Sequence, residues 1–326
     1  MGKIMTMGEI LVEIMATEPG QSLRAPGRLV GPFASGAPAI FIDQVARLGH
    51  AAGIIGCVGD DDFGWLNIER LRGDGVDTSA ITVMKDAVTG SAFVTYEQTG
   101  ERHFIFNITN SASAQLSPSQ VSELRLKECT HFHVMGSSLF SSRIREAMNK
   151  AIEIVKRQGG SVSFDPNIRK EMLGIPGMPE ALTSILKYTD IFLPSGPELT
   201  ILVRASTEEA AIEELLSLGI HEIVVKRGRQ GCEYYDTTRR LSVPALTVSE
   251  VDPTGAGDCF AATYVTCRSG GMPVERSLRY ACASGARAVM RMGPMEGTAC
   301  FTDLDALLAH RDSSGEACGP QEQNRG

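Results

Sequence analysis

Strand-like and helix-like segments alternate in the second half of this 326-residue chain, and no other feature restricts the fold as strongly. The expected strands are His131–Met135, Val162–Asp165, Ile191–Leu193 and Glu222–Lys226. The expected helices between them are Ser142–Gln158, Glu180–Tyr188 and Thr207–Leu218. Strands that alternate with helices pair in parallel, because each helix carries the chain back to the same end of the sheet. The pattern therefore predicts an α/β fold with helices on both faces of a mostly parallel sheet.

The first part of the chain begins with the same alternation and then departs from it. We expect strands at Ile4–Met7, Ile10–Met15 and Ala51–Val58, and helices at Gly36–Leu48 and Phe63–Arg72. Two further segments, Gly90–Tyr96 and Arg102–Asn107, alternate apolar and polar residues around Thr99-Gly100, as a β-hairpin does. Because a hairpin interrupts the strand–helix order, we expect it to lie outside the main sheet.

Composition and charge restrict the partners and the cellular compartment. Lys and Arg number 31 against 39 Asp and Glu, a net charge of −8, and no basic block stands out, so neither nucleic acid nor an anionic membrane is an expected partner. No run approaches 18 apolar residues, and the N-terminus enters a strand pattern without a signal peptide. The eight cysteines are scattered without a C-x-x-C pair, as reduced core thiols are. We expect a cytoplasmic protein.

One large domain is expected over residues 1–312. The tail at 313–326 is polar and is expected to be disordered.

The segment Val251–Phe260 carries the strongest chemical signal. Gly255-Ala256-Gly257 lead into an apolar run that is typical of a buried helix. Small residues at a helix start let a ligand approach the free backbone N–H groups, where the dipole favours negative charge. Asp258 follows in the first turn, where a carboxylate would repel phosphate unless it accepts a proton during phosphoryl transfer. The alternative is a glycine-rich turn in which Asp258 is an ordinary first-turn residue.

Polar or glycine-rich segments follow three of the expected strands. They are Asp165–Arg169, Pro194–Glu198 and Lys226–Gly231. In parallel α/β sheets, ligands bind at the carboxyl ends of the strands. A single Asp or Gly after a strand is usually a turn residue, but several such ends together favour a ligand site.

In its motifs the chain resembles the ribokinase-like PfkB family of carbohydrate kinases, over about Lys3 to Phe301. The most specific motif is D-x-T-G-A-G-D-x-F at Asp252–Phe260. The supporting segments are Ser35–Ala39, Gly59–Gly64, Gly100–Phe104 and Val224–Cys232. The resemblance implies a three-layer α/β/α sandwich with a small β lid, formed by residues of about 14–32 and 90–107, which often pairs two subunits into a homodimer.

The resemblance also implies a role for each matching residue. Asp258 corresponds to the base that deprotonates the sugar hydroxyl, and Gly255, Ala256 and Gly257 to the anion hole for the transferred phosphoryl group. The positions implied around ATP are Asn167, Arg169, Ser195, Lys226, Gly228, Gly231 and Cys282. Those implied around the sugar substrate are Glu13, Gly36, Asn107, Arg169 and Asp258. Glu198 corresponds to the acid that holds Mg²⁺ through water, and Asp252, Thr254 and Gly293 to a backbone site for a monovalent cation such as K⁺.

Several positions depart from the family pattern. Ile40 replaces an Asn that usually contacts the sugar, and Ser195 replaces the Asn of the N-x-x-E motif. Glu13 stands where an Asp is typical, and its extra methylene would shift the carboxylate by about 1.5 Å. Pro253 stands where Thr is common in the motif. The departures near the sugar indicate a substrate other than ribose.

The substrate class follows from a missing arginine. Many 2-keto-3-deoxygluconate kinases have an Arg three residues before a Ser-Ala pair, and here that position is Ile108. Because a sugar acid would lose a bidentate partner, a neutral ketohexose such as fructose or tagatose fits better. The alternatives left open are a 2-keto-3-deoxygluconate kinase, a nucleoside kinase and a non-catalytic sugar sensor. A dinucleotide-dependent oxidoreductase and a P-loop NTPase lack their motifs.

Overall fold

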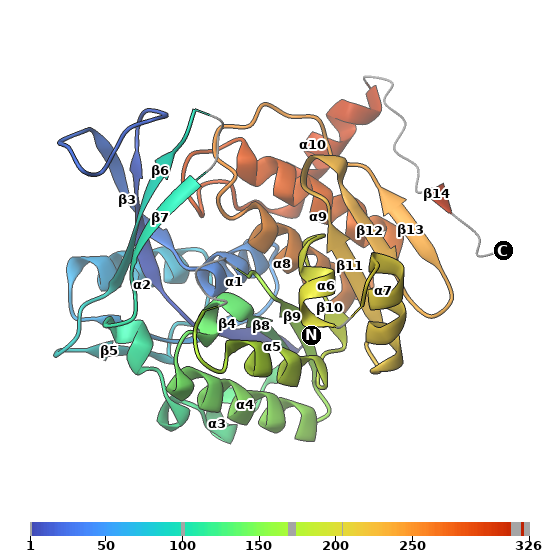
Figure 1. The fold of residues 1–326 in the computed structure, drawn as a ribbon, viewed down its shortest axis with the longest axis horizontal. Helices are drawn as coiled ribbons and strands as arrows, with labels where there is room; N and C mark the ends of the chain where they lie inside the picture. The colour runs from blue at the N-terminus through green and yellow to red at the C-terminus, as the bar shows by residue number, and fades with distance from the viewer. Residues whose placement is uncertain (1, 99–101, 169–173, 204, 314–320, 323–326) are drawn as a thin grey trace.

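The computed structural model describes residues 2–98, 102–168, 174–203, 205–313 and 321–322 (Figure 1). A ten-stranded sheet has the strand order β14-β13-β12-β11-β10-β9-β8-β1-β4-β5. Its strands are β1 (Lys3–Met7), β4 (Ala52–Gly59), β5 (Ile81–Met84), β8 (Cys129–Met135), β9 (Ser161–Asp165), β10 (Ile191–Phe192), β11 (Glu222–Lys226), β12 (Cys232–Tyr235), β13 (Arg240–Val243) and β14 (Gln321–Glu322).

The middle of this sheet is parallel, as the strand–helix alternation predicts. Parallel pairs join β11, β10, β9, β8, β1, β4 and β5 in turn. The strands β12 and β13 add an antiparallel edge that sequence analysis did not predict. Their four-residue lengths and tight turns leave no crossover helix to mark them. At the same edge Gln321 and Glu322 pair with β13.

Helices cover both faces of the sheet. The described helices are α1 (Ala37–Arg47), α2 (Asp62–Gly73), α3 (Glu123–Leu126), α4 (Ser142–Arg157), α5 (Met178–Leu186), α6 (Glu198–Leu202), α7 (Glu208–Ser217), α8 (Ala256–Ser269), α9 (Val274–Val289) and α10 (Phe301–Ser313). Successive side chains of a strand enter opposite cores: Ile4 packs with α1 and α8, whereas Met5 packs with α4 and α5. The predicted three-layer α/β/α sandwich is confirmed.

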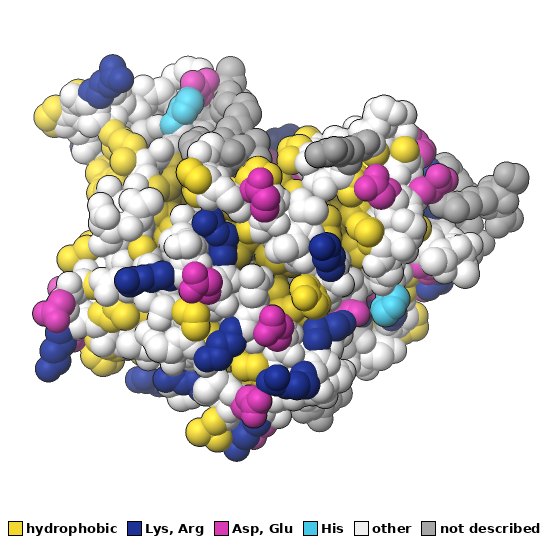
Figure 2. Space-filling model, turned by 60° about the horizontal axis from the view of Figure 1, so that its bottom comes forward, with side chains coloured by type: hydrophobic (Ala, Val, Ile, Leu, Met, Phe, Trp, Pro, Cys, Tyr) yellow, Lys and Arg dark blue, Asp and Glu magenta, His cyan; other side chains and the backbone are white. Residues whose placement is uncertain are grey.

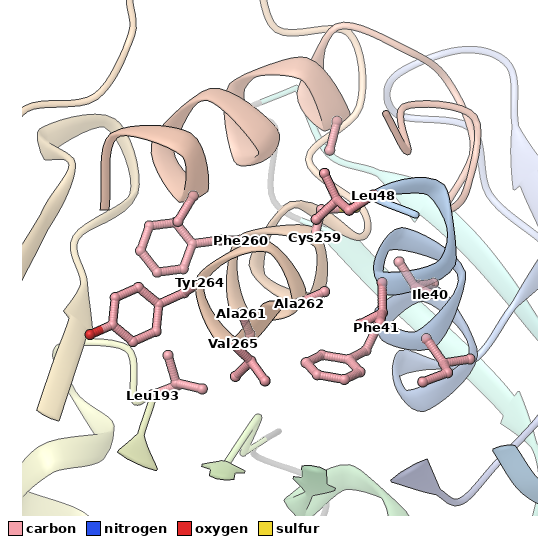
Figure 3. Packing of buried hydrophobic residues seen from close by; sticks show 14 of the residues in the cluster. Ile40, Phe41, Leu48, Leu193, Cys259, Phe260, Ala261, Ala262, Tyr264 and Val265 are labelled. Carbon is pink, nitrogen blue, oxygen red and sulfur yellow. The ribbon is translucent and has the colours of Figure 1, made fainter. Parts of the chain in front are cut away.

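Helix α8 is buried almost all round, because its side chains are apolar or small on every face. Figure 3 shows Val265 directed toward the strands and Ala262 toward α1, where Ile40 and Phe41 lie, whereas Phe260 lies on the side of α9. Buried residues run without interruption from Asp258 to Cys267. A helix that is apolar all round is stable only inside a core. Its packing therefore fixes where the first turn lies.

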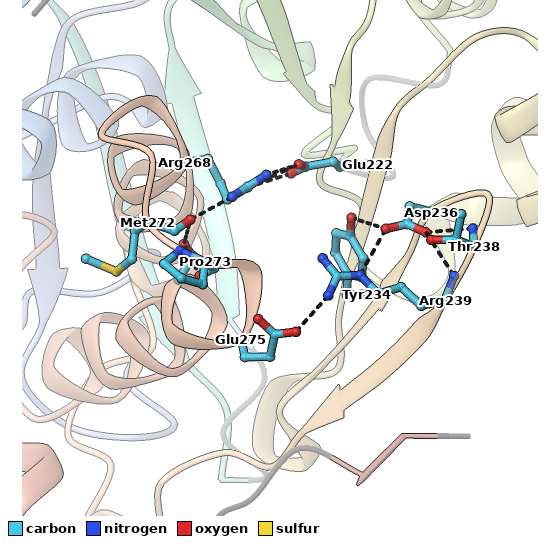
Figure 4. A network of polar contacts seen from close by, with 10 residues as sticks. Glu222, Tyr234, Asp236, Thr238, Arg239, Arg268, Met272, Pro273 and Glu275 are labelled. Atoms are coloured by element: carbon cyan, nitrogen blue, oxygen red, sulfur yellow. Dashed lines mark hydrogen bonds and ion pairs between the residues drawn. The ribbon is translucent and has the colours of Figure 1, made fainter. Parts of the chain in front are cut away.

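The far end of α8 is held by polar contacts (Figure 4). Arg268 forms an ion pair with Glu222 of β11 at 2.6 Å, and the Tyr264 hydroxyl donates to the same carboxylate at 2.6 Å. Nearby, the Tyr234 hydroxyl donates to Asp236 at 2.7 Å. These contacts fix α8 along the sheet, so its N-terminus lies at the carboxyl end of the parallel strands.

A second, four-stranded sheet has the order β3-β2-β6-β7. It consists of β2 (Leu11–Ala16), β3 (Leu29–Ser35), β6 (Gly90–Tyr96) and β7 (Arg102–Asn107), and we call it the lid. The predicted hairpin pairs Ser91 with Asn107 and Tyr96 with Arg102, outside the main sheet as expected. In Figure 1 the lid stands beside the start of α8, apart from the ten-stranded sheet.

Positive and negative side chains are mixed on one face of the molecule (Figure 2). On the face in Figure 2, Lys and Arg side chains are interspersed with Asp and Glu. No helix in the described parts of the chain has the length and apolar composition that crossing a bilayer requires.

Candidate active site

The start of α8 has the geometry of an anion site. Gly255, the N-cap, has φ +79°, and a Cβ atom there would lie 2.4 Å from the Pro294 carbonyl oxygen, so the position requires glycine. No side chain caps the helix, and Ala256 and Gly257 line a cavity. The start of α8 therefore borders an open space that an anion could enter. The Ala256 amide also makes a long hydrogen bond of 3.4 Å to the Pro253 carbonyl.

That cavity has a volume of about 340 Å³ and extends from α8 between β11 and α9. Its lining includes six residues that the sequence assigns to ATP or to the anion hole: Lys226, Gly228, Gly231, Ala256, Gly257 and Cys282. Sequence analysis did not predict the rest of the wall, which includes Ala245, Leu246, Thr247, Val248, Glu250, Ala286 and Val289. One end is thus rich in glycine and carries a lysine, and the other is apolar, which suits a phosphate group and a base. The Cys282 sulfur lies 3.6 Å from that of Cys232.

Asp258 lies in the first turn of α8 and is 9% exposed. Lys226, at the end of β11, approaches from the other side and forms a buried ion pair with Asp165. Burial alone would lower the pKa of Lys226, but the carboxylates of Asp165, Glu198 and Asp258 raise it above its ordinary value. Burial raises the pKa of Asp165 to about 6 despite Lys226. The ammonium group of Lys226 therefore stays charged at neutral pH, near Asp258.

Glu198 connects two of the polar strand ends. Its Oε1 accepts from the Ile168 amide at 2.6 Å, and its Oε2 accepts from the Ser195 amide at 2.6 Å and the Ser195 hydroxyl at 2.7 Å. Asn167 has φ +40°, and its amide donates to Asp165 at 3.2 Å. The structure brings these residues to the Lys226 end of the cavity, although Asn167 and Ser195 do not line it. Arg169 lies outside the described residues.

Asp252 joins the two segments that the sequence assigns to a monovalent cation. Its Oδ1 accepts from the Thr254 amide at 3.0 Å and from the Thr254 hydroxyl at 2.7 Å. Its Oδ2 accepts from the Gly293 amide at 3.0 Å. Asp252, Thr254 and Gly293 are therefore adjacent, as their predicted common role requires.

The residues assigned to the sugar fall into two groups. Glu13 on β2 is buried and accepts from the Ser35 hydroxyl at 2.6 Å, next to Gly36 at the start of α1. Ile40 packs against the catalytic segment, since its Cγ2 would lie 3.2 Å from a Cβ atom at Gly255. Asn107, in contrast, is exposed at the far end of β7, and its amide donates to Ser91 at 3.4 Å. None of Glu13, Gly36 and Asn107 is among the residues that line the nucleotide cavity.

Two lid residues at the site were not assigned by sequence analysis. Arg102 donates from Nη1 to the Thr254 hydroxyl at 2.9 Å. Tyr96 is its partner across the hairpin, and burial together with the nearby Asp252 carboxylate raises the pKa of its phenol. The sequence did contain a signal for Arg102. The alternation of β7 places it on the half-buried side of the strand, together with Phe104 and Phe106.

The comparisons with known proteins agree with this geometry. Residues 1–299 match the model of the family described as pfkB family carbohydrate kinase. This chain belongs to that family. Its motif-based resemblance is thereby confirmed, and the enzyme class with it.

Relatives of this pfkB-family chain include fructokinases and a ribokinase. It is 34% identical over 302 residues to fructokinase-1 of Oryza sativa, with 89% of this chain and 92% of the relative covered. A structure of an E. coli protein named "putative Ribokinase II", in complex with ATP and Mg²⁺, is 53% identical and superposes with a TM-score of 0.92, covering 95% of this chain and 100% of that one. A fructokinase double mutant of Vibrio cholerae, with fructose, ADP and a potassium ion bound, is 25% identical with a TM-score of 0.84, covering 94% and 98%.

Proposed function

We propose that this kinase transfers the γ-phosphoryl group of ATP to a hydroxyl of a ketohexose of the fructose or tagatose type. The observation that carries the proposal is the position of Asp258. It is buried in the first turn of α8, where the amides of the nucleotide cavity begin and Lys226 supplies positive charge. The curated fructokinase relatives support the same substrate class.

The reaction we propose is a direct transfer without a covalent phosphoenzyme. Asp258 accepts the proton of the sugar hydroxyl as that oxygen attacks the γ-phosphorus of ATP, and the bond from this phosphorus to the β–γ bridging oxygen breaks to release ADP. The amides at Gly255, Ala256 and Gly257 stabilise the charge on the transferred phosphoryl oxygens. Lys226 lies close to this position, because a Cβ atom at Gly257 would be 3.7 Å from its Nζ. Preorganised charges of this kind contribute more in a site that excludes water.

The donor groups present fit Mg²⁺ as a hydrated ion carried by the ATP phosphates. Within the described parts of the chain, no group of three or more His, Cys, Asp or Glu side chains could hold a metal ion directly. Glu198 is the acid we assign to this ion: its Oε2 accepts two hydrogen bonds, but its Oε1 accepts one and keeps a second lone pair, with which it would hold the ion through water. When bound, the ion would neutralise phosphate charge during the transfer.

A monovalent cation fits near Asp252, whose carboxylate brings the backbone of Thr254 and Gly293 together. We propose K⁺ bound to backbone carbonyls there. The related Vibrio cholerae fructokinase, solved with a potassium ion, supports this choice.

The residue at position 108, where an arginine would bind the carboxylate of a sugar acid, favours a neutral substrate. Ile108 is partly buried and packs against the hydrophobic core, so this position offers no cation to a carboxylate. We therefore place ketohexoses before 2-keto-3-deoxygluconate. A nucleoside kinase and a non-catalytic sensor are weaker candidates, because the relatives are named as sugar kinases and Asp258 is retained in the anion site.

The test is ATP-dependent phosphorylation over a panel of fructose, tagatose, ribose, 2-keto-3-deoxygluconate and adenosine. We expect the highest kcat/KM with fructose or tagatose. The highest kcat/KM with 2-keto-3-deoxygluconate or adenosine would replace the substrate assignment. Tight sugar binding by calorimetry without turnover of any compound would support the sensor instead.

A further inference from the structure

The lid contacts the catalytic segment at two points on its inner side. Arg102, at the start of β7, donates to the hydroxyl of Thr254 at 2.9 Å across 152 residues of sequence. Phe33, on β3, packs so closely on Gly293 that a Cβ atom there would lie 2.8 Å from its ring. Arg102 supplies a charge-assisted hydrogen bond and Phe33 an apolar contact.

The two contacted residues are held together by a single carboxylate. Asp252 accepts hydrogen bonds from the amide and hydroxyl of Thr254 and from the amide of Gly293. Thr254 directly precedes Gly255, the N-cap of α8. The position of the Thr254 hydroxyl is therefore linked to the position of the anion-hole amides.

Arg102 is held by its own strand in the orientation that this contact needs. It lies on the half-buried side of β7, and its guanidinium group stacks over the Phe104 ring at 5.5 Å from the centroid. His103, the next residue, points to the opposite, exposed side and contacts Glu97 at 2.7 Å. Because Arg is planar and always charged, its hydrogen bond to Thr254 is directional and does not depend on pH.

We propose that Arg102 is a positioning residue that couples the lid to the anion hole, so that phosphoryl transfer is efficient only when the lid lies over the site. The inference rests on the proposed function, because it concerns the same transfer. Arg102 would act through Thr254 and Asp252, not on the reacting atoms. Its second effect would be to restrict ATP hydrolysis, since a lid held on the catalytic segment keeps water from the γ-phosphoryl group.

The test compares Arg102→Ala, Arg102→Lys and Thr254→Val with the wild type. For Arg102→Ala we expect kcat with the sugar to fall about 10- to 100-fold, the size of one charged hydrogen bond, with KM for ATP within about twofold. The ratio of ATP hydrolysis to sugar phosphorylation should rise. Arg102→Lys should recover most of kcat, because Lys keeps a charged donor. The double variant Arg102→Ala/Thr254→Val should be no slower than Thr254→Val alone, because Thr254→Val already removes the contact with Arg102 together with the hydroxyl's hydrogen bond to Asp252.

His103→Ala is the matched control, and it should stay near wild type because it alters only the outer side of β7. Multiplicative losses in the double variant, or an unchanged hydrolysis ratio in Arg102→Ala, would overturn the proposal. Hydrogen exchange gives a readout that needs no sugar: amides at 290–296 should exchange faster in Arg102→Ala and not in His103→Ala. If the wild type phosphorylates no sugar, the proposed function fails, and this exchange difference still decides whether the coupling exists.

Discussion

At the residue scale, the positive charge of Lys226 compensates several carboxylates that are buried close together. It pairs with Asp165 and is influenced by Glu198 and Asp258. Removing one partner of a buried charged group leaves the others uncompensated, which is far more costly than losing an exposed ion pair. The lysine therefore serves the stability of the site as well as its proposed chemistry.

We predict that Lys226→Met lowers the free energy of unfolding at pH 7.5 by roughly 3–5 kcal/mol. The deficit should shrink at pH 5. The pKa of Asp165 is already raised to about 6, and loss of the cation raises it further, so the carboxyl is neutral at pH 5. Stability linked to this group is thus present at low pH and is lost as pH rises through about 6.

Urea denaturation at the two pH values measures this effect. Lys150→Met is the control, because Lys150 is exposed and donates to the Pro118 carbonyl at the surface. An equal loss of stability at both pH values would show that Lys226 does not compensate the charge of Asp165.

At the element scale, α1 and α2 hold the segment that follows α9 and carries Gly293. Arg70 of α2 donates to the Met295 carbonyl at 2.8 Å and to Glu296 at 2.9 Å. Asp43 of α1 is fully buried nearby, with its Oδ2 3.8 Å from an Arg70 nitrogen. Burial, reinforced by Asp74, raises the pKa of Asp43 to about 7.

We predict that Asp43→Asn stabilises the protein at pH 8 by about 2–4 kcal/mol and has little effect at pH 4. The reason is that the folded pKa of Asp43 lies above its unfolded value, so the ionised carboxylate opposes folding as pH rises toward 7 and above. Thermal unfolding from pH 4 to pH 8 measures the difference. Asp74→Asn should change stability less at pH 8, because the repulsion it relieves at Asp43 is offset by loss of the charge that pairs with Arg70 at 2.6 Å. A destabilised Asp43→Asn variant at pH 8 would show that the charge of Asp43 is needed to hold Arg70.

Sequence analysis succeeded for elements with a strong local pattern. The parallel strands, the hairpin and the glycine start of α8 each carry a periodicity or a turn signal within a few residues. The apolar wall at 245–248 has no such signal, because it is an irregular segment between β13 and α8. The contacts of Lys226 with Asp165 and of Arg102 with Thr254 span 61 and 152 residues. Only the assembled sheet shows which strand ends meet.

At the scale of the whole molecule, the lid has an inner side on the site and an outer side in solvent. In the strand order of the described sheet, β3 and β7 are its edges. Leu29 and Ile105 are 43% and 53% exposed on these strands. Unpaired edges with exposed apolar residues favour association with another chain, and we predict a homodimer through the lid.

Light scattering of the wild type should therefore give twice the monomer mass. Ile105→Lys should shift it toward monomer, because a charge would be buried in the interface. Leu124→Lys is the control, since Leu124 is 75% exposed on α3 outside the lid. A monomeric wild type would contradict the predicted dimer.

The central claim is that Asp258 is the base in an anion hole formed by the start of α8. The most direct measurement is kcat of Asp258→Asn with the sugar that the wild type turns over best, together with ATP affinity by calorimetry. We predict a fall in kcat of roughly 10²–10⁴, with folding and ATP affinity nearly unchanged, because the amide keeps the shape of the carboxylate and cannot accept the proton. A near-normal kcat in Asp258→Asn would contradict the claim.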